Sequence, residues 1–286
     1  MNNKLSFSER MSAYRHHPMS LVQRILVLLA AFVTFGVLVA LIVYILVMGV
    51  PNLRPSLFAW KYNSENVSML PAIVNTVVMI VMTLVMSVPF GVGAAIYLVE
   101  YAKRGNKLVK LIRITAETLS GIPSIVYGLF GFLMFVIALH MSYSMLAGAL
   151  TLAIMVLPTI LRTTEEALKA VPDSYREGSF GLGAGRLRTV FRVVLPSAVP
   201  GIFSGVILAI GRIVGETAAL IFTSGTVTGV AGSLLDSGRT LAIHMYCLLN
   251  EGLYREEAYA TAVVLLVLVI GINALSGAVA KKITKQ

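Results

Sequence analysis

Two charged residues stand alone within a long apolar stretch of this chain. Arg212 and Glu216 lie four positions apart, with uncharged runs on both sides, and Thr217 follows them directly. A guanidinium suits an oxyanion such as phosphate because its planar fork donates to two oxygens at once. Asn75 and Thr76 place uncharged polar groups in another apolar run. The five residues are candidates for a substrate path, although such polar side chains also bond to neighbouring helices.

A structural role for the charged pair remains open beside the chemical one. Residues four apart meet on one helix face, so the two charges could form an ion pair that holds helices together. Gly201, Gly205 and Ala209 fall on the same face at about 100° per residue, and small residues permit close helix contact. Arg212 lies about 18 Å of helix beyond Pro200, near mid-membrane, where an unpartnered charge costs about 2.5–3.5 kcal/mol.

The composition is that of an integral membrane protein. The chain has 286 residues, of which 57% are hydrophobic and 13% charged, whereas soluble domains average about 25% charged residues. Its net charge of +10 would favour nucleic acid in a soluble protein, but here the cations cluster at the ends of apolar runs, which indicates membrane topology and no nucleic-acid partner. The single cysteine and four histidines lack ligand spacing, so no metal site is predicted.

The apolar runs predict an all-α polytopic protein with six membrane spans. The expected parts are a cytoplasmic segment (1–23), a six-span domain (24–280) that contains a polar loop (162–197), and a cytoplasmic tail (281–286). Within the domain the spans are expected at 24–49, 70–98, 118–139, 144–161, 198–224 and 258–280.

The distribution of cations orients these spans. Only Arg54, Lys61, Arg239 and Arg255 fall in the predicted outer loops, and every other Lys or Arg except Arg212 falls in a predicted inner segment. Because cytoplasmic loops carry the excess of Lys and Arg, both termini are predicted to lie in the cytoplasm, with the chain in the bacterial inner membrane alongside lipid.

Residues 171–196, the elbow, separate two long apolar runs. Ser174 and Glu177 have the spacing of a capping box that starts a short helix. The glycines between 181 and 185 favour a helix stop, and a second basic segment begins at Arg186. We expect a helix, a glycine corner and a second helix in water; a solvated loop that only ties two spans together is the alternative.

The elbow resembles the cytoplasmic loop of ABC-importer permeases, which has the form E-A-A, three residues, G, nine residues, I-x-L-P. Here Glu177, Gly183 and Pro196 keep that spacing, and the departures are Gly178, Ser179 and Val193. In the family this loop is a coupling helix that docks on an ATPase subunit. The resemblance implies ATPase contacts for Ser174, Glu177, Gly178, Ser179, Leu182, Gly183 and Arg186.

Two further segments, 119–131 and 211–219, are similar to the permeases of phosphate importers, in which an Arg and a Glu at the positions of Arg212 and Glu216 are implicated in transport. Residues 240–246 favour the A-type permease. The resemblance implies phosphate import by alternating access, with a homologous C-type second permease, two copies of the ATPase and a periplasmic phosphate-binding protein as partners. This chain has no P-loop, so it is not expected to be an enzyme or to hold a cofactor, and ATP-Mg would bind the ATPase.

Two rival functions remain. The charged pair does not separate phosphate from sulfate or molybdate, and an ion-coupled secondary transporter or channel would need no docking loop. A membrane enzyme is disfavoured because no Ser/His/Asp or metal-ligand set gathers at one depth.

Overall fold

The computed structural model describes residues 18–103 and 105–284, with the side chains of the last turn of that range left out. Within this part the regular structure is entirely helical, as predicted. Residues 1–17 of the predicted cytoplasmic segment, Arg104 of a basic segment, and residues 285–286 of the predicted tail lie outside the described residues.

The elements follow one another in a simple order. The α-helices are α2 (Pro18–Gly49), α3 (Leu70–Ile96), α4 (Lys107–Ser120), α5 (Ser124–Gly131), α6 (Met145–Lys169), α7 (Asp173–Gly181), α8 (Arg186–Thr189), α9 (Leu195–Gly215), α10 (Ala218–Ile221), α11 (Leu241–Glu251) and α12 (Arg255–Thr284). Short 3₁₀ turns η1 (Val50–Asn52) and η2 (Pro55–Phe58) follow α2, and π-helical turns η3 (Tyr97–Tyr101), η4 (Phe132–Ala138) and η5 (Val190–Val194) extend α3, α5 and α8.

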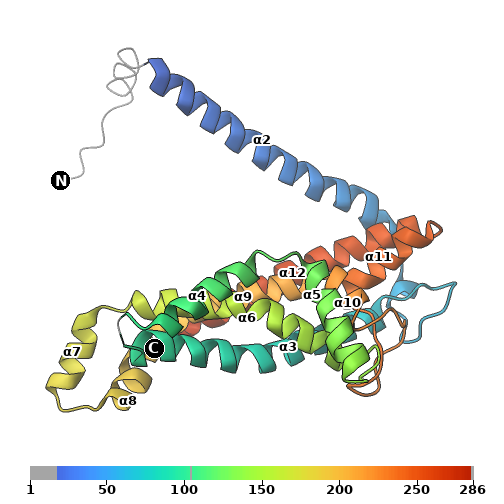
Figure 1. Ribbon diagram of the computed structural model, residues 1–286. Coiled ribbons are helices and arrows are strands. Elements are labelled where there is room, and N and C mark those ends of the chain that lie inside the picture. Colours follow the sequence, from blue (N-terminus) through green and yellow to red (C-terminus); the bar gives the residue numbers. More distant parts are fainter. Residues whose placement is uncertain (1–17, 104, 285–286) are drawn as a thin grey trace.

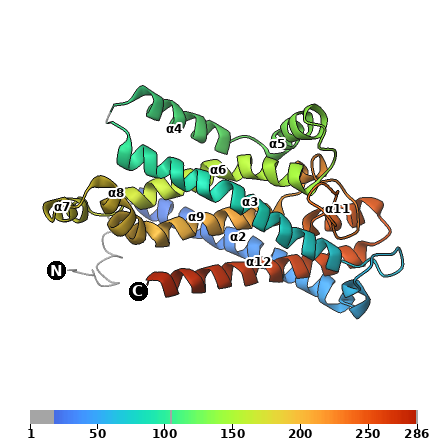
Figure 2. The same cartoon turned by 90° about the horizontal axis from the view of Figure 1, so that it is seen from below.

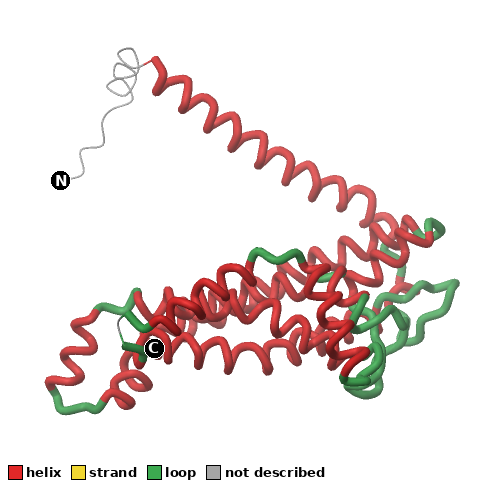
Figure 3. Tube along the Cα trace, in the orientation of Figure 1, coloured by secondary structure: helices red, strands yellow, loops and turns green. Residues whose placement is uncertain are grey.

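Helices α3, α6, α9 and α12 pack side by side into an elongated bundle (Figures 1 and 2). Helix α2 leaves the bundle at one end and touches it mainly through α12, where the Tyr44 and Tyr259 hydroxyls lie 3.1 Å apart. The loops gather at the two ends of the bundle (Figure 3). Helix α2 is apolar on all sides and exposed along its length, which suits a helix surrounded by lipid or by a partner span.

Small residues bring the central helices together. A Cβ on Gly201 would meet Ala167 of α6, and one on Gly205 would meet Thr163, so the predicted small-residue face of this span does pack against a neighbour. Gly211 and Gly215 do not behave in this way, because a Cβ at either would meet no described atom within 4 Å. Close approach lets large side chains of α3, α6 and α9 interlock, and the cluster includes Met79, Leu152, Met155, Ile160 and Ile213.

Of the described helices, five are long and apolar enough to cross a membrane, and a bent pair makes a sixth. The bent pair corrects the limits of the span predicted at 118–139, because it begins at Lys107 and ends at Ala138. Helix α4 ends at Ser120, α5 starts at Ser124, and the two axes differ by 103°. Pro123 favours the break, because proline disfavours the helical conformation for the residue before it. The basic segment after residue 103, predicted as a loop, is largely helix α4.

The predicted fifth span, 198–224, has different limits. The helix runs without a gap from Arg186 to Gly215, and Pro200 lies inside it. It ends at Gly215 because Glu216 adopts an extended backbone conformation (φ −73°, ψ 127°). Glu216 therefore lies beyond the helix, and the prediction that Arg212 and Glu216 share one helix face is wrong.

A paired glycine substitution in α3 tests the tight packing of α3 on α6. We expect Gly91→Ala to destabilise the protein by about 1–3 kcal/mol, because the new methyl would lie 2.7 Å from Cγ2 of Ile160, a branched side chain with little room to move. Gly93→Ala is the control, since a Cβ there meets nothing within 4 Å. Thermal unfolding of both purified variants measures the difference, and equal melting temperatures would contradict the packing.

Candidate functional site

The first half of the elbow is helix α7, and a glycine ends it. Gly183 has the left-handed φ of 81°. The amide of Ala184 donates to the carbonyl of Ser179 (3.1 Å), and the amide of Gly183 donates to that of Phe180 (2.9 Å). These two bonds form a Schellman motif, which satisfies carbonyls at the helix end. The predicted glycine stop is confirmed.

The predicted capping box is wrong. Helix α7 begins at Asp173, directly after Pro172, and no side chain caps its first turn. Ser174 is therefore the second helical residue rather than the cap, and Glu177 has no cap to reach back to. The start is instead favoured by the fixed φ of proline and by the negative charge of Asp173 at the positive end of the helix dipole.

The elbow presents large apolar side chains outside the spans. Tyr175 is 52% exposed, Phe180 47% and Leu182 90%, and the backbone around Glu177 and Gly178 is open as well. An exposed apolar patch on a polar segment is typical of a surface that binds another protein. The elbow therefore has exposed apolar side chains of the kind that a partner protein could cover.

The elbow is held in shape by contacts between its two helices and the bundle. The Ser179 and Thr189 hydroxyls form a hydrogen bond of 2.9 Å that joins α7 to α8. The guanidinium of Arg186 lies 5.3 Å from the ring centroid of Tyr101, at the end of η3. Ser179 and Arg186 thus have structural contacts in addition to the docking role predicted for them.

A buried ion pair that the sequence did not reveal connects the elbow to α3 and its π-turn. Arg176 donates to the Glu100 carboxylate from Nη2 (2.8 Å) and Nε (3.2 Å), and to the carbonyls of Val171 (2.8 Å) and Leu168 (2.9 Å). The hydrogen bonds to Glu100 raise the pKa of Arg176 above its ordinary value. Both side chains are largely buried, so α7 cannot separate from the end of η3 without exposing an uncompensated charge.

Glu216 acts as a helix cap. After α9 ends, its carboxylate accepts a hydrogen bond from the amide of Ala219 (3.0 Å) in the short helix α10. Glu216 is buried, and Thr217, between the two helices, is half-buried. A carboxylate at a helix N-terminus satisfies a free amide that lipid could not. The break in this span is therefore stabilised by one of the two charges that the sequence singled out.

The short helices that follow the two non-helical links, α5 and α10, touch each other. A Cβ on Gly128 of α5 would be 2.8 Å from Cα of Ala219, so α5 and α10 touch backbone to backbone. Across the first break, the hydroxyl of Tyr127 donates to the carbonyl of Leu119 (2.8 Å). Arg212 is close enough to Tyr127 to interact with it electrostatically. The candidate substrate arginine thus lies beside the place where both broken spans meet.

Arg212 has no carboxylate partner in the part of the chain that the structure describes. No Asp or Glu oxygen there lies within 4.0 Å of its guanidinium, so the alternative of an ion pair with Glu216 does not hold. Its side chain is half-buried. Gly201 lies against Ala167 and Gly205 against Thr163, so each step forward along α9 corresponds to one step back along α6. Extended to Arg212, this register reaches residue 156, close to the centre of α6.

Asn75 and Thr76 bind the backbone of a loop. The Asn75 amide donates to the carbonyls of Gly229 (2.9 Å) and Arg239 (3.3 Å) and accepts from the amide of Ala231 (3.1 Å). The Thr76 hydroxyl accepts from the amide of Leu241 (2.8 Å), at the start of α11. Both residues are buried and their polar atoms are hydrogen-bonded to backbone groups, so they hold residues 225–241 against α3.

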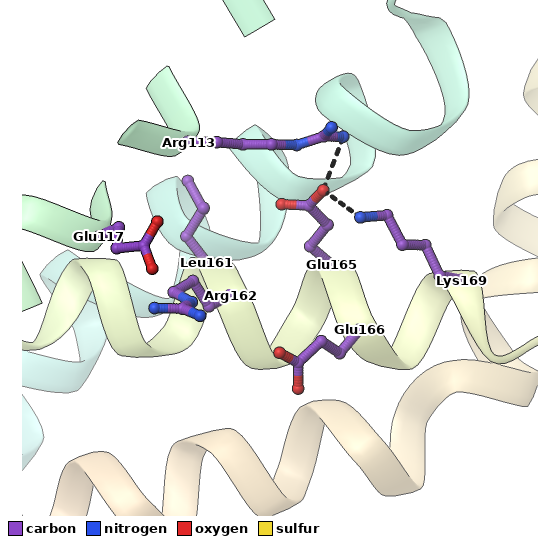
Figure 4. Close-up of a pocket in the computed structure, with 7 residues that line it drawn as sticks. All are labelled: Arg113, Glu117, Leu161, Arg162, Glu165, Glu166 and Lys169. Atoms are coloured by element: carbon purple, nitrogen blue, oxygen red, sulfur yellow. Dashed lines mark ion pairs between the residues drawn. The ribbon is translucent and has the colours of Figure 1, made fainter. Parts of the chain in front are cut away.

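Another pairing that the sequence did not reveal joins α4 to α6. Figure 4 shows Arg113 and Lys169 converging on the carboxylate of Glu165, at 2.7 Å and 2.6 Å. The Glu165 side chain is 7% exposed. Glu165 and Lys169 are four positions apart on one helix, so their contact could have been predicted from the sequence. Arg113 is distant in sequence, and its contact with Glu165 could not have been predicted in this way.

A second group of buried polar residues lies at the opposite end of the bundle from the elbow. Arg239 is 3% exposed, and its guanidinium lies 4.7 Å from the ring centroid of Tyr62. His244 is fully buried, and its ring meets Tyr62 edge-on. Burial, and next the charge of Arg239, lower the pKa of His244 to about 3. The ring is therefore neutral at physiological pH.

Comparison with known proteins places this architecture in a family. Residues 87–285 match the family described as "Binding-protein-dependent transport system inner membrane component". The chain is 35% identical over 248 residues to a "Probable ABC transporter permease protein YqgI" of Bacillus subtilis, which covers 81% of this chain and 84% of that protein. It is 35% identical over 210 residues to a "Phosphate transport system permease protein PstA" of Mycobacterium leprae, covering 72% and 68%.

Solved structures show the same fold at low identity. A bacterial alginate ABC transporter, crystallised with its alginate-bound periplasmic protein, contains a chain with a TM-score of 0.70 at 14% identity, covering 96% of this chain and 98% of that one. The MetNI methionine ABC transporter in an inward-facing conformation has a TM-score of 0.58 at 20% identity, covering 75% and 94%. The predicted fold, that of ABC-importer permeases, is confirmed.

The buried His244 predicts an acid-sensitive fold. Unfolded histidine binds a proton near pH 6.5, whereas folded His244 does so only near pH 3, so between these values the unfolded state holds more protons. Stability should therefore fall as pH falls below about 6.5, by up to about 1.4 kcal/mol per pH unit. Melting temperatures from pH 8 to pH 5 measure the slope.

His244→Phe should flatten this slope, because phenylalanine fills a similar volume and cannot bind a proton. His140→Gln, at an exposed position, is the control and should keep the slope of the unmodified protein. An unchanged slope in His244→Phe would show that another group titrates.

Proposed function

This chain belongs to the family of binding-protein-dependent transport system inner membrane components, and we propose that it is the permease subunit that carries inorganic phosphate in an ATP-driven importer. Family membership makes it a multi-pass inner-membrane permease of an ABC importer, which works with an ATPase and a binding protein and is not itself a catalytic subunit. Phosphate as the substrate is our proposal, and several relatives, including that of Yersinia pestis at 41% identity over 153 residues, are named phosphate permeases.

The observation that carries the proposal is the unpaired Arg212. A half-buried guanidinium at the depth of the centre of α6 needs a counter-charge or water, and no described carboxylate supplies one. An oxyanion in transit would supply the charge and accept two hydrogen bonds from the planar fork. Because the Glu216 carboxylate accepts a hydrogen bond from α10, it does not pair with the guanidinium of Arg212. It stabilises the non-helical link next to that residue instead.

The elbow is the proposed receiver of motion from the ATPase. Its exposed side chains Tyr175, Phe180 and Leu182 supply an apolar docking tip, and the buried Arg176–Glu100 pair ties that tip to the end of η3. This role places the elbow, the N-terminal segment and the C-terminal tail in the cytoplasm. A homologous C-type permease would complete the pathway, a dimeric ATPase would bind ATP-Mg, and a periplasmic phosphate-binding protein would deliver the anion.

Transport would proceed by alternating access. Closure of the ATPase pair moves α7, and Arg176 passes the displacement to η3 and α3 through Glu100. The non-helical links at residues 121–123 and 216–217 then let α5 and α10 shift relative to α4 and α9, because segments joined by such a link can rotate with little loss of hydrogen bonding. Arg212, beside both breaks, holds the anion while access changes sides.

Replacing Arg212 tests the substrate role. Arg212→Gln should reduce phosphate uptake by about a hundredfold or more, because two charge-assisted hydrogen bonds are lost, while the complex still assembles. Uptake of radioactive phosphate into vesicles measures the effect. Lys61→Gln, an exposed cation outside the elbow and without an ion pair among the described residues, should leave uptake unchanged.

Normal uptake by Arg212→Gln would remove this residue from the mechanism. Competition by sulfate or molybdate in the same assay identifies the anion. Strong competition by either, with weak competition by excess unlabelled phosphate, would instead indicate an importer for another oxyanion.

Replacing Arg176 tests the coupling role. Arg176→Ala leaves Glu100 buried without its partner and should destabilise the protein by about 3 kcal/mol or more. The double variant Glu100→Leu with Arg176→Met should recover much of this stability, because the only charge left without its partner, that of Asp173, is exposed to solvent. We nevertheless expect uptake per ATP hydrolysed to stay low in the double variant, since the polar link between elbow and bundle is gone. Full recovery of both stability and coupling would show that the pair is only structural.

A further inference from the structure

A basic groove opens where α4 begins beside η3 and the end of α6. Its volume is about 530 Å³, and its floor includes the apolar side chains of Leu98 and Val109. Its charged lining is wholly cationic among the described residues, and consists of Lys103, Lys107, Lys110, Arg113 and Lys169. A cavity of this kind favours an anion.

Three of the five cations are available to a ligand. Arg113 and Lys169 share the buried carboxylate of Glu165, as Figure 4 shows. Lys103, Lys107 and Lys110 have no carboxylate within 4.0 Å in the part of the chain that the structure describes. The groove therefore has a net positive charge even after Glu165 is counted.

The first turn of α4 adds to this field. Asn106 caps the helix by accepting a hydrogen bond from the amide of Leu108 (2.9 Å), and Gly105, Asn106 and Lys107 all line the groove. The positive end of the helix dipole thus lies at the groove wall. Such an end favours phosphate groups.

The other flank of α4 is apolar and uncovered. Leu108 is 55% exposed and Leu111 59%, while Val109 and Ala116 pack inward against Leu98 and Leu161. At about 100° per residue, the exposed leucines lie on one side of the inward face and Lys110 with Arg113 on the other. One helix therefore places a surface fit for hydrocarbon next to a surface fit for an anionic headgroup.

We propose that this groove binds the phosphate of an anionic phospholipid of the cytoplasmic leaflet. The inference goes beyond phosphate transport and uses only the membrane orientation proposed above. The lysines bind the headgroup, the apolar floor contacts the glycerol backbone, and the acyl chains lie along Leu108 and Leu111. Basic pockets between spans on the cytoplasmic side recognise such headgroups. An acidic protein segment fits less well, because it would leave the exposed leucines uncovered.

The bound lipid has a structural consequence. Arg113 and Lys169 line the groove and also hold Glu165, so the headgroup lies against the contact that fastens α4 to α6. Attraction between the lipid phosphate and both cations keeps α4 seated at the start of the bent span. The lipid thereby stabilises the half of that span that leads to the break at residues 121–123.

Lipid titration of the whole transporter tests this site. Native mass spectrometry of the purified complex with added phosphatidylglycerol should show binding that phosphatidylethanolamine does not match. The triple variant Lys103→Gln, Lys107→Gln, Lys110→Gln should weaken phosphatidylglycerol binding about a hundredfold, since each basic side chain near an anionic lipid contributes roughly a factor of five. The control Arg54→Gln, Lys61→Gln, Arg255→Gln removes three exposed cations at the other end and should bind normally.

Three results would overturn the proposal: full lipid binding by the triple variant, an equal loss in the control variant, or displacement of the lipid by millimolar inorganic phosphate. The last result would identify free phosphate as the ligand. A second measurement uses the unmodified complex, so that misfolding of a variant cannot affect the result. Amine acetylation of the unmodified complex should be slowed at Lys103, Lys107 and Lys110 by phosphatidylglycerol but not by phosphatidylethanolamine. Equal labelling with both lipids would also contradict the site.

Discussion

A helix that ends inside lipid exposes backbone groups that only the protein can satisfy, and this constraint governs the centre of the molecule. The chain breaks one span at residues 121–123, and the helix of another span ends at Gly215, where residues 216–217 separate it from α10. At the first, Tyr127 donates to the carbonyl of Leu119; at the second, Glu216 accepts from the amide of Ala219. Helices α5 and α10, which follow these two points, touch at Gly128 and Ala219. Irregular backbone at this depth is thereby tolerated, and the sole charge of α9 lies next to it.

The charged residues of the described chain are used in two contrasting ways. Where rigidity is needed, carboxylate and cation are buried together, as in the pairs of Glu100 with Arg176 and Glu165 with Arg113. Arg212 is treated differently, because the nearest acidic residue in sequence bonds to the backbone instead of to the guanidinium. An unpaired charge within a membrane span is costly, and such residues often mark the path of a substrate or ion, which is the role proposed for Arg212.

Much of the fold follows from local pattern, and the parts that do not follow depend on long-range contacts. Uncharged runs located both ends of the spans predicted at 70–98 and 258–280 to within a few residues, and one end of each of the others. Glycines located the end of α7 at Gly183. The break at Gly215 was missed because its cause is a hydrogen bond to Ala219 rather than a proline. For the same reason the sequence suggested Asn75 as a substrate ligand, although its partners are backbone atoms more than 150 positions away. The pairing of Arg176 with Glu100, 76 positions apart, left no local signal.

Helix α3 connects the two ends of the molecule. With η3 it is anchored to the elbow through Glu100, which Arg176 holds with three donor contacts. At its other end, Asn75 and Thr76 hold the backbone of residues 229–241 and the start of α11. Between these anchors it packs along most of its length on α6. Because hydrogen-bonded anchors at both ends resist slipping, a displacement of α7 cannot be absorbed at its contact with η3. It must instead move α3 and the far loop together, or strain the broken spans beside Arg212, which are the parts with the fewest helical hydrogen bonds to oppose it.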